Sequence, residues 1–158
     1  MNNFFTRQAI NILMSIFLSL VTVSFLTIFN VDLHTTFIET WGFQALTFFS
    51  FLCFSQLFVI IFGNPGMLFN IIALSLQLVT CGVIVPLNML PDFFQNVGGY
   101  LPATYVANGY YTIIYGAGEL SSNAYWLLGI AGITLVVSLA KTILFSKVKK
   151  VAGELNVA

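Results

Sequence analysis

The sequence has very few charged residues, and this scarcity excludes most soluble proteins. Charged residues make up 6% of the 158 residues, against 59% hydrophobic residues, and the mean hydropathy is +0.99. A soluble domain carries about 25% charged residues, because it needs them to cover its surface. Most of this surface must therefore face lipid, and we expect a single transmembrane domain over residues 1–158.

Other absences narrow the range of possible functions. Cysteine occurs twice, as Cys53 and Cys81 inside apolar stretches, so neither a disulfide framework nor a metal-binding spacing is present. The lone histidine, His34, has Asp32 and Glu39 nearby in one polar loop, which resembles a metal cluster only faintly. The sequence contains no GxxxxGK(S/T) phosphate-binding loop for ATP. We expect no enzymatic activity, no cofactor, no metal and no nucleic-acid partner.

Long apolar runs are what the chain has in abundance. Each is close to the ~20 residues that an α-helix needs to cross ~30 Å of hydrocarbon at ~1.5 Å per residue. Strand spans are excluded, because the runs do not alternate and are too long. The sequence therefore predicts an all-α integral membrane protein with four transmembrane helices, at 9–29, 42–62, 67–85 and 124–145.

The few charges follow an uneven pattern that predicts the topology. The five basic residues lie toward the two ends, at Arg7, Lys141, Lys147, Lys149 and Lys150. Four of the five acidic residues lie in two other loops, at Asp32, Glu39, Asp92 and Glu119. Because basic residues are retained on the cytoplasmic side, we expect a multi-pass plasma-membrane protein, bacterial in type, with cytoplasmic N- and C-termini.

Ionisable side chains are missing from the middle of the runs. A proton- or ion-coupled transporter usually needs such a group at mid-membrane, so this class is disfavoured. Lys141 lies about one turn inside the fourth run, and its flexible stem is expected to carry the ammonium to the headgroups.

Small and polar residues recur on single helical faces, at spacings of three and four. In lipid, helices associate through such residues. The stripes predict pore or helix-contact positions at Asn11, Ser15 and Ser19 in the first run, Gln56 in the second, and Asn70, Ala73 and Gln77 in the third. Gly129 and Gly132 permit close approach in the fourth run. Two interpretations stay open: the stripes hold the helices together, or they line a path formed with another copy or another half.

The segment 86–123, between the third and fourth runs, is punctuated by proline. Pro86, Pro91 and Pro102 exclude one uninterrupted helix. Short apolar segments remain at 92–97 and 103–115, and the second is rich in tyrosine, which suits a membrane interface. We predict short re-entrant or interfacial helices in the outer leaflet; an amphipathic cap without a transport role is the alternative.

An ordered set of positions carries a family resemblance. The set comprises Gly63-Asn64-Pro65-Gly66, Leu76-Gln77-Leu78-Val79, Gly82, Pro86, Leu90-Pro91-Asp92-Phe93-Phe94-Gln95, Leu101-Pro102-Ala103-Thr104-Tyr105 and Asn108-Gly109. From about Thr6 to Lys150 the chain resembles the C-terminal membrane domain of the YhgE/Pip (phage infection protein) family, which is similar to ABC-2 type transporter permeases.

The resemblance implies that these are the last four of six spans. It also implies that the re-entrant outer segment contains Gly82, Pro86, Pro91, Phe94, Gln95, Pro102, Tyr105, Asn108 and Gly109. Because the first two helices of such a permease are missing, the chain is expected to be a fragment or to work with a separately encoded N-terminal half or a second copy.

The function implied is a permease component or fragment that supports export of a hydrophobic or cell-envelope substrate. Its energy is expected to come from a separate cytoplasmic ATPase. The alternative is a non-transporting membrane scaffold, either a phage-infection determinant or a secretion-system accessory.

Overall fold

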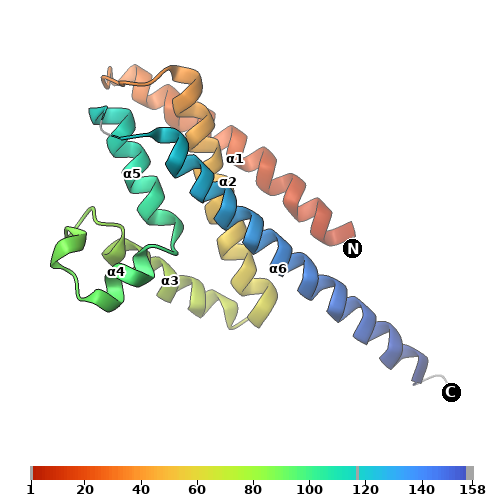
Figure 1. Cartoon of the computed structure of the whole chain (residues 1–158). Helices are drawn as coiled ribbons and strands as arrows, with labels where there is room; N and C mark the ends of the chain where they lie inside the picture. The colour runs from red at the N-terminus through yellow and green to blue at the C-terminus, as the bar shows by residue number, and fades with distance from the viewer. Residues whose placement is uncertain (1, 117, 156–158) are drawn as a thin grey trace.

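The computed structural model describes residues 2–116 and 118–155, which form helices joined by short connections (Figure 1). In chain order these are α1 (Asn2–Ile28), α2 (Phe37–Phe62), α3 (Gly66–Thr80), the 3-10 helix η1 (Leu87–Met89), α4 (Asp92–Gly98), α5 (Pro102–Tyr115) and α6 (Leu120–Leu155). No strand is present in these ranges. The predicted all-α class is confirmed, and the two short helices expected between the last two apolar runs are present as α4 and α5.

Within the part of the chain that the structure describes, three helices are long and apolar enough to cross a membrane. They correspond to the first, second and fourth predicted spans, and they cover Phe4–Ile28, Phe37–Phe62 and Leu120–Phe145. These helices begin before the predicted spans: α2 begins at Phe37, ahead of residue 42, and α6 begins at Leu120, ahead of residue 124.

The predicted third span at 67–85 is not confirmed as one helix. Instead, α3 has 15 residues and ends at Thr80. At ~1.5 Å per residue it is ~22 Å long, which is shorter than ~30 Å of hydrocarbon. The backbone explains the early end, because Gly82 adopts a φ of 79° and Pro86 follows shortly after it. A left-handed glycine cannot continue a right-handed helix.

A second short helix follows α3 in the chain. After the detour through η1 and α4, the 14-residue α5 runs back toward the α1–α2 connection (Figure 1). The start of α1, the α2–α3 turn and the end of α6 therefore lie toward one end of the bundle, while the α1–α2 and α5–α6 connections lie at the other (Figure 1). At the centre is α2, which packs against α1, α3, α5 and α6.

Local sequence explains both ends of α2. At its start Thr36 and Glu39 form a capping box, in which each side chain bonds the other residue's backbone N–H at 3.3 and 2.9 Å. At its end Gly63 adopts a φ of 67°, and α3 begins at Gly66. A Cβ on Gly66 would lie 2.4 Å from the Phe58 carbonyl oxygen, so only glycine allows so tight a turn.

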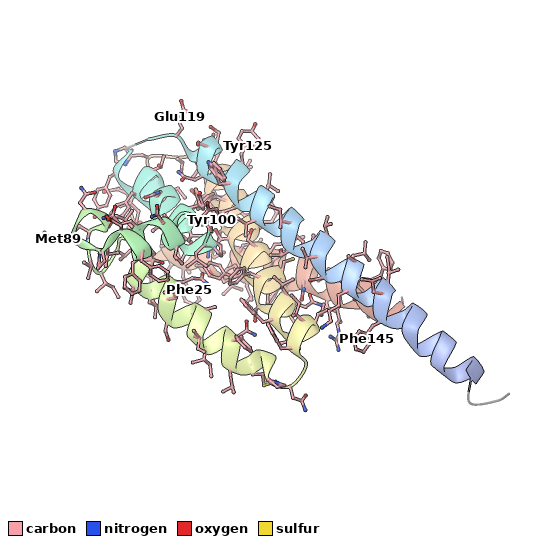
Figure 2. The ribbon with its side chains drawn as sticks, turned by 60° about the horizontal axis from the view of Figure 1, so that its bottom comes forward. Phe25, Met89, Tyr100, Glu119, Tyr125 and Phe145 are labelled. Atoms are coloured by element: carbon pink, nitrogen blue, oxygen red, sulfur yellow. The ribbon has the colours of Figure 1, made fainter. Side chains whose placement is uncertain are left out.

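Large apolar side chains mostly point outward. The buried apolar core is small and centres on Phe43, Ile113 and Leu127, where α2, α5 and α6 meet. Figure 2 shows side chains projecting along the helices, among them Met89 and Tyr125, which are 77% and 73% exposed. This arrangement is the one expected where lipid rather than water surrounds the protein.

Candidate functional site

The first polar stripe joins α1 to α2. The Oε1 atom of Gln56 accepts hydrogen bonds from Asn11 Nδ2 at 2.7 Å and from Gln8 Nε2 at 3.0 Å. Asn11 and Gln56, both predicted, are thus brought together. Gln8 was missed, although its spacing of three from Asn11 places it on the same helical face.

Ser15 and Ser19 continue this stripe but make no bond to another helix. They are 3% and 0% exposed, and their hydroxyls donate to the carbonyls of Ile12 and Ile16 at 2.8 Å each. With the hydroxyl paired locally, each serine presents a small surface on which α2 can pack closely. For α1 this favours the helix-contact interpretation.

A second seam, between α2 and α6, was not predicted as a stripe. Ser50 is fully buried, and its hydroxyl donates to the Leu127 carbonyl at 3.3 Å. The signal was the spacing of three and four among buried polar residues, which are Thr40, Gln44, Thr47 and Ser50 on α2 and Thr134 and Ser138 on α6. Gly129 and Gly132, by contrast, would have nothing within 4 Å of an added Cβ, so they do not mediate packing within the chain.

The stripe on α3 faces a cavity instead of a close contact. Asn70 Nδ2 donates to the Ser55 carbonyl at 3.1 Å, while Ala73 and Gln77 are 9% and 3% exposed. The cavity has a volume of about 200 Å³ and lies between α2 and α3. We call it the amide chamber, and its lining includes Phe51, Ser55, Asn70, Ala73 and Gln77. The Oε1 atom of Gln77 is buried without a hydrogen-bond partner.

A larger cavity lies beside the end of α3 and along α5. Its volume is about 410 Å³, and its lining is mostly apolar. We call it the tyrosine chamber, and its lining includes Phe51, Cys81, Ala107, Tyr110, Tyr111 and Tyr115. Phe51 lines both chambers, so the two adjoin at this ring.

The predicted outer-segment residues before α5 shape the detour between α3 and α5. Gly82 turns the chain after α3, and Pro86 and Pro91 directly precede η1 and α4. Within α4, Gln95 Nε2 donates to the Leu90 carbonyl at 2.7 Å, and the ring of Phe94 meets that of Phe93 edge-to-face at 5.4 Å. None of these five predicted residues lines either chamber.

The other predicted residues of this segment fix α5. Pro102 is buried at the first turn, and Tyr105 donates to the Gly99 carbonyl at 2.7 Å while stacking on Trp126 at 5.3 Å. Gly109 lies against Phe43, whose Cζ would be 2.1 Å from an added Cβ. Asn108 is exposed and joins none of these contacts.

A polar contact missed from the sequence connects the two half-length helices. Thr104 Oγ1, near the start of α5, donates to the Gly98 carbonyl at 2.7 Å and lies 3.4 Å from the Thr80 carbonyl at the end of α3. A Cβ on Gly98 would be 2.9 Å from that same Thr80 oxygen. The end of α3 and the start of α5 therefore meet at one buried point.

Lys141 lies against the end of α2. Its ammonium donates to the Ile61 carbonyl, one residue before α2 ends, and lies 5.6 Å from the centre of the Phe145 ring. It thus reaches the end of a neighbouring helix, not the bundle interior.

His34, the candidate for a metal cluster, donates its backbone N–H to the Ile113 carbonyl at 2.8 Å. Among residues 2–116 and 118–155, no group of three or more His, Cys, Asp or Glu side chains gathers.

Comparison with known proteins shows similarity to a bacterial protein. The chain is 30% identical over 154 residues to a Bacillus subtilis (strain 168) protein named "Uncharacterized protein YhgE". The match covers 96% of this chain but 20% of that protein, so the chain spans about a fifth of its relative's length. No family model and no solved structure matches the chain. The similarity supports a relationship to YhgE along nearly the whole of this chain, in line with the family resemblance seen in its sequence.

Proposed function

We propose that this chain is a membrane permease component that supports export of a hydrophobic or cell-envelope substrate. The observation that carries the proposal is the interrupted passage through α3 and α5, with two adjoining chambers beside it. Irregular backbone at membrane depth is tolerated where protein covers it or where it lines a cavity. Discontinuous helices also form the substrate sites of many transporters.

The proposed topology has four crossings. Three are the continuous helices α1, α2 and α6, and the fourth is shared between α3 and α5, with residues 81–101 forming the detour that joins these two helices. The basic residues support cytoplasmic termini, since Arg7 and Lys141 belong to α1 and α6, whose terminal ends point toward the same end of the bundle (Figure 1). On this topology the protein lies in the plasma membrane of a bacterium.

The proposed partners follow from what the sequence lacks and what the helices expose. ATP hydrolysis is assigned to a separate cytoplasmic ATPase, as in ABC-2 type transporters, which the family resemblance suggested. Gly129 and Gly132, which meet nothing within the chain, offer close approach to helices of a second copy or of a separately encoded N-terminal half.

Native purification and a deletion strain test this function together. The protein is extracted from its own membranes in mild detergent, and co-purifying ATPases are identified by mass spectrometry. The deletion strain is complemented with the wild type, with Ala107→Phe, which fills the tyrosine chamber, or with Ala140→Phe, which adds the same ring on an exposed face of α6. We expect an ATPase partner, and sensitivity to envelope-active compounds that only Ala107→Phe fails to reverse. Absence of both the partner and the phenotype would refute export.

One observation favours a second function, a non-transporting scaffold. Asn11, Ser15 and Ser19 of α1 are paired within the chain, through Gln56 or through carbonyls of α1, so this stripe holds helices together. Phage adsorption and protein secretion, compared between wild-type and deletion strains, test this alternative; a defect in either without any change in compound sensitivity would favour the scaffold.

A further inference from the structure

The two chambers share one lining residue of α2 and follow one face of α3. Phe51 of α2 lines both, and on α3 the amide chamber's Gln77 stands four residues before the tyrosine chamber's Cys81. Residues four apart lie on the same helical face, one turn from each other. Together the linings of the two chambers extend from Asn70 near the start of α3 to Tyr115 at the end of α5, with Phe51 between them.

The chemistry of the amide chamber calls for a hydrogen-bond donor. Gln77 is 3% exposed and its Oε1 atom has no partner, although a buried carbonyl oxygen without a donor is costly. Ser55 and Asn70 add further polar atoms to the same lining. No Asp, Glu, Lys, Arg or His is among the described residues that line either chamber. An ionised group would find no counter-ion here, whereas a hydroxyl or amide N–H would find an acceptor.

The tyrosine chamber suits hydrocarbon. Apart from its tyrosines, its lining consists of Phe51, Cys81, Val83, Ile114 and small apolar residues. It is also about twice as large as the amide chamber, at 410 against 200 Å³. Val83 and Ile114 at its edge are 57% and 37% exposed, so the chamber is continuous with the apolar surface that faces lipid.

We propose that the two chambers open into one groove past the Phe51 ring, and that this groove binds one lipid-like molecule with an uncharged hydroxyl or amide head. The head donates a hydrogen bond to Gln77 Oε1, and the hydrocarbon lies in the tyrosine chamber. The inference rests on the proposed export function, for which it names the substrate class.

Photolabelling of the full chain in phosphatidylcholine nanodiscs tests the site. The probe is a diacylglycerol with a diazirine in one acyl chain, and the comparison probe is a phosphatidic acid with the same chains and an anionic head. We expect the diacylglycerol to label peptides from 103–115 preferentially and saturably, with unlabelled diacylglycerol as competitor. Equal labelling by both probes, or labelling that does not saturate, would identify bulk lipid and overturn the proposal. Selectivity for the head group and saturation of labelling are both measured on the wild-type chain.

Two variants locate the two ends of the ligand. Gln77→Leu removes the acceptor and is expected to weaken diacylglycerol labelling about tenfold, as for loss of one buried hydrogen bond. Ala107→Phe is expected to abolish it, whereas Ala140→Phe, on an exposed face of α6, is expected to leave it unchanged. If both chamber variants keep the wild-type melting temperature and are labelled as strongly as the wild type, the proposed binding site is wrong.

The two proposals fail separately. Saturable, head-selective labelling in a protein whose deletion leaves export unchanged would refute export and leave the binding site standing. Non-selective labelling would refute the site even if a deletion phenotype establishes export.

Discussion

The bundle formed by α1, α2 and α6 and the arm formed by α3, α4 and α5 are packed by different means. Amide and hydroxyl side chains make the bundle's contacts, as at Gln56 and Ser50, while Gly42, Gly129 and Gly132 have nothing within 4 Å of an added Cβ. In the arm, by contrast, glycine residues are in close contact with neighbouring segments. Added Cβ atoms on Gly66, Gly98 and Gly109 would lie 2.4, 2.9 and 2.1 Å from their nearest neighbours.

The two regions are therefore expected to differ in how well they tolerate substitutions. A polar side chain paired to its own helix or to one neighbour adapts to small shifts, so the bundle is tolerant. Where two segments touch because a glycine has no Cβ, there is no space for an added methyl group, so the arm is less tolerant of substitution. The arm also leaves two chambers against α2, so it combines rigid contact points with unfilled space.

The largest expected effect is at the turn between bundle and arm. Gly66→Ala places a methyl group 2.4 Å from the backbone oxygen of Phe58, which cannot move without shifting α2. We expect a loss of about 3 kcal/mol in unfolding free energy, measured by denaturant titration in detergent micelles. The matched control is Gly129→Ala, which meets nothing and is expected to stabilise α6 by up to about 1 kcal/mol. Equal effects at the two glycines would erase the proposed difference between the regions.

An intermediate effect is expected where α5 lies against the bundle. Gly109→Ala drives a methyl group into the Phe43 ring, which is 4% exposed and has little room to turn. The expected cost is about 2 kcal/mol by the same titration. Phe43→Leu is expected to recover part of this loss in the double variant, giving a favourable coupling energy. Strictly additive losses would mean that the contact is not what limits the helix separation.

The smallest effect is expected inside the bundle. Gln56→Leu leaves the amides of Gln8 and Asn11 without their shared acceptor. Because polar contacts between membrane helices contribute modestly, we expect a loss of about 1 kcal/mol. Gln95→Leu, which removes an exposed bond to the Leu90 carbonyl, serves as control and is expected to change stability less. A larger loss for Gln56→Leu than for Gly66→Ala would reverse the comparison.

Most of the fold could be predicted from proline positions and hydropathy. Pro102 located the start of α5 to within one residue, because the first residues of a helix need no N–H for bonds within it. The apolar runs located α1, α2 and α6. Hydropathy could not reveal that α3 stops at Thr80, because the residues that follow are also apolar and the break depends on the backbone at Gly82.

The candidate site was only partly predictable, for a related reason. Asn70 and Gln77 were found from their spacing, but the chamber they face depends on the position of Phe51 in another helix. Gly109 was singled out by family resemblance, and only the fold reveals its contact with Phe43. Contacts between distant segments leave no local periodicity, so spacing alone cannot report them.

The continuity of α6 has a mechanical consequence. Its apolar stretch ends at Phe145, yet the helix runs on to Leu155 without a break, making 36 residues, or about 54 Å at ~1.5 Å per residue. The helix is unbroken between that end and Trp126, which stacks on Tyr105 of α5. A rotation of α6 would therefore also displace the point at which α5 contacts it.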